Sequence, residues 1–161
     1  MPILSIGYGG RSEGEFWNLL RSFDAAHLVD VRSRPFGMFP DFNRPTLEVK
    51  SREWGIPYKF MGDELGGKPD CPNCYDDDGQ VSYPLVREQD FYQRGIERLV
   101  ELQLNTTACL MCAERRPGDC HRSLLIGIDL LQLGIEVLHV LEVGQVVGQR
   151  ALMRVEQPSL L

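Results

Sequence analysis

Cys109-Leu-Met-Cys-Ala-Glu-Arg-Arg-Pro-Gly-Asp-Cys-His-Arg-Ser123 combines an apolar run, a polar turn and the beginning of an amphipathic helix. This order is typical of a strand that leads into a helix at one edge of a parallel sheet. Such turns direct backbone N–H groups at whatever lies above the sheet, which favours bound anions. The turn also holds thiol, carboxylate, imidazole and guanidinium groups. We therefore expect a functional site here.

Apolar strand-like runs alternate with helical patterns on both sides of this segment. The expected strands are 2–7, 26–31, 56–60, 106–111 and 136–141, and the expected helices are 12–22, 46–54, 88–104 and 120–133. This alternation predicts an α/β fold, a single domain with a mostly parallel sheet and helices on both faces in three layers. We expect the domain to span residues 3–141, with a long irregular insert at 61–87 and a C-terminal extension at 142–161.

Length and composition favour one globular domain. The 161 residues are 43% hydrophobic and 25% charged, which is ordinary for a folded domain of this size. No run approaches the roughly 18 apolar residues of a membrane span, and the N-terminus lacks a basic lead or a cleavage site. The five cysteines are an odd number, which argues against a disulfide framework. We expect a cytoplasmic protein with reduced thiols and no membrane partner.

The charge pattern favours binding of a specific anion. The net charge of −6 argues against broad binding of nucleic acid. Lysine occurs three times among the 17 basic residues, and the other 14 are arginines, which grip carboxylates and phosphates by two-point hydrogen bonds. Six arginines fall in two segments that we place at one edge of the sheet: Arg32, Arg34, Arg44, Arg115, Arg116 and Arg122.

Ligands of such sheets bind at the carboxyl ends of the strands, where four segments should meet: 7–11, 32–44, 61–67 and 112–120. The candidate catalytic residues are Cys112, His121, Glu114 and Glu64. The candidate ligand-binding residues are Tyr8, Asp30, Arg32, Arg34, Arg44, Arg115, Cys120 and Arg122.

Each leading candidate has a structural alternative. Cys112 is a nucleophile if nearby arginines and backbone N–H groups lower its pKa, but a free cysteine often simply packs. His121 is either an acid/base group or a half-buried histidine, and Arg122 either binds ligand or clamps Asp30 or Glu114. Cys109 should face the other side of the sheet as core, and we expect Asp119 to cap the following helix.

Five motifs occur in order along the chain. They are Ser5-Ile-Gly-Tyr-Gly-Gly10, Leu28-Val-Asp-Val-Arg-Ser-Arg-Pro35, Pro40-Asp-Phe-Asn43, Glu64-Leu-Gly-Gly67, and Met111-Cys-Ala-Glu114 through Cys120-His-Arg-Ser123. Together they resemble the bacterial and archaeal family called domain of unknown function 488 over residues 3–141. The resemblance implies a compact α/β domain and brings no established activity.

A weaker resemblance is to the layout of rhodanese-like sulfurtransferases, in which a cysteine loop follows a strand and precedes a helix. The loop from Cys112 to Arg122 is longer and contains Pro117 and a second cysteine. The position six residues after Cys112, where a phosphatase loop has arginine, is Gly118. This likeness supports topology more than chemistry.

The pair Cys71 and Cys74 has the spacing of half a zinc site. No second half follows in the right arrangement, so we favour a reduced, exposed pair and expect no cofactor and no metal. Completion by Cys112, Cys120 or His121, or by a second subunit, is an open alternative.

These observations favour an enzyme that acts on an anionic, phosphate-bearing small molecule, a nucleotide or a nucleic-acid end in an arginine-rich, thiol-containing pocket. One alternative is a noncatalytic module for nucleotides or nucleic acid, in which Tyr8, Phe36, Phe39 and Phe42 stack on bases. Those aromatics are alternatively a plug that holds the long loop. A third class is a sulfur-transfer protein with a persulfide on Cys112.

Overall fold

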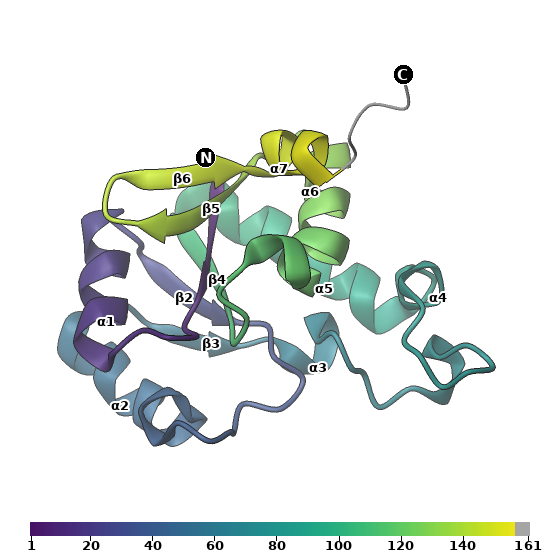
Figure 1. Cartoon of the computed structure of the whole chain (residues 1–161), viewed down its shortest axis with the longest axis horizontal. Coiled ribbons are helices and arrows are strands. Elements are labelled where there is room, and N and C mark those ends of the chain that lie inside the picture. The colour runs from purple at the N-terminus through teal and green to yellow at the C-terminus, as the bar shows by residue number, and fades with distance from the viewer. Residues whose placement is uncertain (157–161) are drawn as a thin grey trace.

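A six-stranded sheet forms the centre of the molecule. In the computed structural model, which describes residues 1–156, the strands lie in the order β3-β2-β4-β1-β5-β6 (Figure 1). All neighbouring pairs are parallel except β5 and β6, which are antiparallel. The strands are β1 Ile3–Gly7, β2 His27–Asp30, β3 Tyr58–Phe60, β4 Ala108–Cys112, β5 Val137–Glu142 and β6 Gln145–Gly148. The predicted mostly parallel sheet is confirmed.

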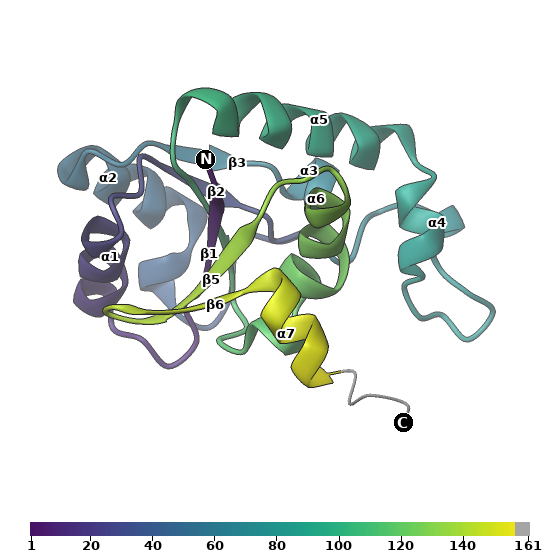
Figure 2. The same cartoon turned by 90° about the horizontal axis from the view of Figure 1, so that it is seen from above.

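Helices cover both faces of this sheet (Figure 2). One face carries α1 and α2; the other carries α3, α4, α5 and α6, and α7 follows β6. The helices are α1 Glu13–Ser22, α2 Arg44–Trp54, α3 Gly62–Leu65, α4 Tyr83–Arg87, α5 Asp90–Asn105, α6 Ile128–Gln132 and α7 Gln149–Glu156. The single three-layer α/β domain is therefore confirmed.

Alternation along the strands builds two separate hydrophobic cores. Leu110 of β4 packs with α5 and α6, whereas its neighbours Cys109 and Met111 pack with α1 and α2. This is the two-residue period of a strand whose two faces are both buried. Cys109 is fully buried, which confirms its assignment to the core, and Cys112 contacts the opposite core.

The predicted insert contains short elements and no long helix. Within residues 61–87 lie α3, the 3-10 turn Pro72–Cys74 and α4. A bridge between Tyr75 and Val81 closes the small loop that holds the three aspartates. The insert thus extends the layer that α5 forms.

The predicted C-terminal extension is structured as far as it is described. β6 forms a hairpin with β5, and α7 then packs against α6. Residues 157–161 of the predicted extension lie outside the described part of the chain. Among the described residues, no helix has the length and hydrophobicity needed to cross a membrane.

Candidate functional site

A pocket opens at the carboxyl ends of β1, β2 and β4. Its volume is about 340 Å³, and it is lined by Tyr8, Arg32, Ser33, Arg34, Phe36, Gly67, Lys68, Cys112, Ala113 and His121. Register explains the convergence, because Gly7 at the end of β1 pairs with Cys112 at the end of β4, and Asp30 at the end of β2 pairs with Met111. The predicted edge of the sheet therefore carries the pocket.

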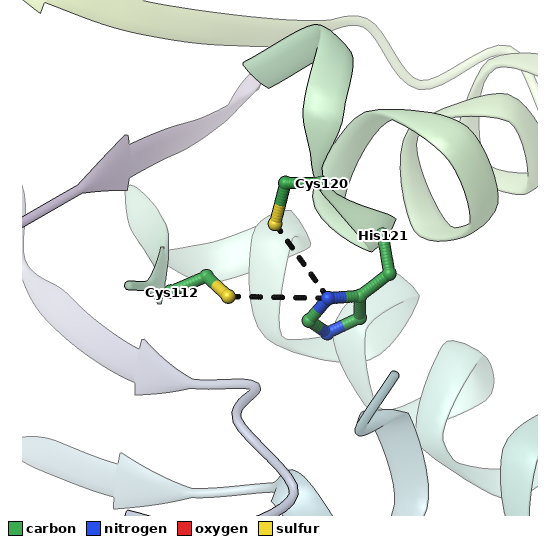
Figure 3. A group of neighbouring side chains, drawn as sticks. All are labelled: Cys112, Cys120 and His121. Atoms are coloured by element: carbon green, nitrogen blue, oxygen red, sulfur yellow. Dashed lines mark hydrogen bonds between the residues drawn. The ribbon is translucent and has the colours of Figure 1, made fainter. Parts of the chain in front are cut away.

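Cys112 and His121, which line this pocket, meet the thiol of Cys120 (Figure 3). The Nδ1 atom of His121 lies 3.9 Å from the sulfur of Cys112 and 3.6 Å from the sulfur of Cys120. All three atoms lie within 4.8 Å of one another. Cys112 is half-buried and lines the pocket, whereas Cys120 is buried beneath it. Among the described residues, these three side chains form the one cluster of His, Cys, Asp or Glu whose ligand atoms are close enough together to reach a common metal ion.

A hydrogen bond to Val31 and packing against Gly67 fix the orientation of the His121 ring. Its Nε2 atom lies 2.8 Å from the carbonyl oxygen of Val31, which immediately follows β2. A carbonyl oxygen only accepts hydrogen bonds, so Nε2 carries the proton and, in the neutral ring, the lone pair of Nδ1 faces the two sulfurs. The backbone of Gly67 lies against the same ring, since a Cβ atom built there would come within 3.0 Å of it.

Cys120, and not Asp119, precedes the site helix. Asp119 ends the 3-10 turn Pro117–Asp119, and Cys120 is extended. The carbonyl of Cys120 accepts hydrogen bonds from the N–H groups of Ser123 and Leu124. The expected Asp119 cap is therefore wrong, because the proline-initiated turn takes up that residue. The helix continues as the π-helical segment Arg122–Gly127, a conformation often found at functional sites.

The two thiols influence one another's protonation. The hydrogen bond with Cys120 and burial raise the pKa of Cys112, and the hydrogen bond from Cys112, followed by His121 and Arg122, lowers the pKa of Cys120. Arg122 lowers the pKa of Cys112, in the direction expected of a nearby arginine, but Cys120 and burial outweigh it, so the net direction is upward. Arg115 instead forms an ion pair with Glu142.

Arg122 is a buried clamp. It donates hydrogen bonds to Ser5 Oγ at 2.5 Å and to the carbonyl oxygen of Glu114 at 2.6 Å. Ser5 Oγ also lies 2.8 Å from His139 Nδ1, and His139 Nε2 lies 2.7 Å from Gln149 Oε1. This chain of buried polar groups joins the site loop to β1, β5 and α7. Sequence reasoning missed Ser5 and Gln149, because nothing local marks a polar residue whose partners are distant.

Asp30 and Arg32 form a second buried structure. Arg32 binds both carboxylate oxygens of Asp30 and the carbonyl oxygen of Phe42. Tyr8 stacks on Phe42 with ring centroids 4.4 Å apart. Tyr58 also donates a hydrogen bond to Asp30, and burial followed by this carboxylate raises the Tyr58 pKa. Arg32 lines the pocket, but most of its donors are committed to holding the loop.

Four other candidates lie away from the floor of the pocket. Arg44 pairs with Glu48 on α2, and Glu64 pairs with Arg98 of α5. Glu114 accepts a hydrogen bond from the N–H of Arg116 on the exposed loop, and Arg115 is held by Glu142. None of these four residues lines the pocket.

Arg34 and Lys68 are the available cations of the pocket. Both side chains are exposed, line the pocket and form no ion pair with the side chains described, those of residues 1–154. Lys68 was not among the predicted binding residues. The preceding Gly66 and Gly67 are the sequence signal that could have identified it, since paired glycines permit close approach of the backbone.

The second thiol pair lies in the insert. Cys74 is fully buried, and Cys71 is half-buried beside Gln89. Burial, followed by the contact with Cys71, raises the pKa of Cys74 to about 11. Within the described residues, no third metal-ligating side chain joins this pair. The expectation that both thiols are exposed is wrong, because Cys74 packs into the core with α4 and α5.

Comparison with known proteins identifies the family. Residues 13–128 match the family described as Domain of unknown function DUF488. The match covers more than half of the chain, so the protein belongs to this family. No curated protein and no solved structure matches the chain, and the rhodanese-like likeness receives no support from these comparisons.

Proposed function

We propose that the protein is an enzyme that acts on an anionic, phosphate-bearing ligand, of the class of nucleotides or nucleic-acid ends. The observation that carries this proposal is the combination of unpaired cations at the rim with reactive side chains at the floor. Arg34 and Lys68 line the pocket with exposed side chains, which we call its rim, and Cys112 and His121 line it with more buried ones, which we call its floor.

The charge of the pocket supports an anion. None of its lining residues is acidic, although the chain as a whole carries a net charge of −6. Basic groups in a concave site with little solvent strengthen the attraction for an anion. Arginine supplies paired donors to phosphate oxygens, and lysine supplies a compact charge. The pocket is therefore locally positive although the whole chain is negatively charged.

The residues divide into binding, reactive and positioning groups in this proposal. Arg34 and Lys68 bind the anion, and Cys112 and His121 contact the reacting atoms. Arg32 and Arg122 position the loops, as their hydrogen bonds to Phe42 and Glu114 suggest. A cytoplasmic location, where thiols stay reduced, belongs to the same proposal.

Binding of inorganic phosphate and nucleotides, measured by calorimetry, tests the anion site. Arg34→Ala and Lys68→Ala should each weaken binding by roughly tenfold, because one charged hydrogen bond contributes about 1.5 kcal/mol. Arg52→Ala removes an equally exposed arginine on α2 and should leave binding unchanged. Equal losses in all three variants, or no binding by the wild type, would reject the anion site.

Turnover is tested with phosphate monoesters, phosphate diesters and nucleoside triphosphates. Cys112→Ser and His121→Ala should remove activity and keep the fold, as followed by circular dichroism. Unaltered activity in both variants would reject their roles.

A noncatalytic binding module is the second candidate. Phe36 lines the pocket and is 61% exposed, so one aromatic ring is available to stack on a base. Tyr8 and Phe42 stack on each other instead, and both are buried. Tight nucleotide binding that falls steeply with salt, without turnover of any substrate, would favour this candidate.

A further inference from the structure

We propose that Cys112, Cys120 and His121 bind one zinc ion at the floor of the pocket. Two sulfurs and one imidazole nitrogen come from the end of β4 and the start of the site helix, and they face a common point (Figure 3). Sulfur and nitrogen ligands of this kind favour zinc among the abundant divalent ions.

The distances between the ligand atoms fit tetrahedral coordination. Zinc binds thiolate sulfur at about 2.3 Å and imidazole nitrogen at about 2.0–2.1 Å, so tetrahedral angles place sulfur and nitrogen about 3.6 Å apart. The observed separations from His121 Nδ1 are 3.6 Å to Cys120 and 3.9 Å to Cys112. The two sulfur–nitrogen separations therefore require only a few tenths of an ångström of adjustment. The two sulfurs lie within 4.8 Å of one another, and zinc would draw them to about 3.8 Å.

The surroundings of the imidazole support the same assignment. Histidine ligands of metals usually donate their other N–H to a carbonyl or carboxylate oxygen, which fixes the ring and leaves the remaining nitrogen for the ion. The contact between His121 Nε2 and Val31 O provides this arrangement. Gly67 packs on the ring and limits its rotation.

The three residues leave a fourth coordination position. Cys112 and His121 both line the pocket, so this position opens toward Arg34 and Lys68. Three protein ligands with one open position are typical of catalytic zinc, whereas structural zinc is enclosed by four. Two thiolates neutralise the ion, and the nearby cations remain free for an anion. In the proposed function, on which this role rests, bound zinc would activate water or polarise a phosphoryl oxygen. Cys112 and His121 would then act on the reacting atoms through the ion, as its ligands, and not as a free nucleophile and base.

Metal content of the intact chain tests the site. The protein is purified under reducing conditions, stripped with a chelator and reconstituted with Zn²⁺ alone, and zinc per chain is measured by mass spectrometry. The wild type should hold one equivalent. Cys112→Ser, Cys120→Ser and His121→Ala should each lower zinc affinity at least tenfold. Cys71→Ser, which alters another half-buried thiol, should retain full occupancy.

Cobalt substitution provides a test that does not depend on the variants folding. Co²⁺ in the wild type should give the visible absorption of a tetrahedral thiolate complex. Substoichiometric zinc in the reconstituted wild type, an octahedral cobalt spectrum, or one equivalent of zinc in the double variant C112S/C120S would each overturn the proposal.

The metal site and the proposed function fail separately. Stoichiometric zinc without phosphate binding would retain the metal site and remove the anion function. Phosphate binding that depends on Arg34, in a protein that takes up no zinc, would retain the anion function and reject the metal site.

Discussion

His139 and Gln149 meet at 2.7 Å between β5 and α7, with the imidazole Nε2 on the amide oxygen. An amide oxygen only accepts hydrogen bonds, so Nε2 carries the proton and Nδ1 accepts from the hydroxyl of Ser5. Both ring nitrogens of His139 therefore have a hydrogen-bond partner while the ring is neutral. Burial is the main cause that lowers its pKa from 6.5 to about 4.

Stability should therefore depend on pH through His139. The unfolded chain binds a proton at this ring below pH 6.5, but the folded protein resists until about pH 4. The full unfolding free energy is present above pH 6.5, and roughly 3 kcal/mol is lost as the pH falls from 6.5 to 4. Denaturant titrations of wild type and His139→Gln at pH 7 and 4.5 should show a smaller loss in the variant.

His27→Gln is the matched control for this experiment. Burial also lowers the His27 pKa, but that ring is only partly buried and contacts Thr106 at the amino end of β2. The unfolding free energy of His27→Gln should therefore depend on pH almost as strongly as that of the wild type. An unchanged dependence in His139→Gln would contradict the assignment.

Gly7 should not tolerate a side chain. A Cβ atom at this position would lie 1.9 Å from the carbonyl oxygen of Glu114, which is backbone and cannot rotate away. We expect Gly7→Ala to lower the unfolding free energy by about 1–3 kcal/mol or more. Gly14→Ala, at an exposed position of α1 with open space around it, should instead stabilise by about 0.5–1 kcal/mol. Thermal unfolding measures the stability change in both variants. Equal changes in Gly7→Ala and Gly14→Ala would contradict the predicted clash at Gly7.

The buried pair of Asp30 and Arg32 should be important for stability. Asp30 is fully buried and accepts hydrogen bonds from Arg32 and Tyr58. Asp30→Ala leaves a buried guanidinium without its partner and should cost about 3–5 kcal/mol. Glu48→Ala breaks the exposed pair with Arg44 and should cost less than about 1 kcal/mol. Denaturation midpoints that shift equally would show that burial does not distinguish the two pairs.

Periodicity predicted the parallel sheet because local patterns carry that information. The alternation along β4 placed Cys109 and Cys112 on opposite faces, as the two cores show. The same alternation brought Cys112 and His121 to one edge, since a strand end and the following helix are neighbours in sequence. Fold class and the floor of the pocket were therefore accessible from sequence.

Ion pairs between residues distant in the sequence could not be predicted from local patterns. Glu64 meets Arg98 and Arg115 meets Glu142 across 34 and 27 residues, and no local spacing signals either contact. The π-helical segment Arg122–Gly127 departs from the 3.6-residue period on which the expected helix was based. Arg44, Glu64 and Arg115 each form an ion pair with a residue outside the pocket, and Glu114 accepts a hydrogen bond from the backbone N–H of Arg116.

A second cavity, of about 220 Å³, lies beside the pocket and shares with it the wall formed by Ser33, Arg34 and Lys68. The backbone fixes part of this partition, because the N–H of Lys68 donates a hydrogen bond of 2.8 Å to Ser33 Oγ. The long side chains of Arg34 and Lys68 form the rest and face both compartments. A charged group bound by these two side chains would therefore stand between two cavities, and either cavity could receive the remainder of the molecule.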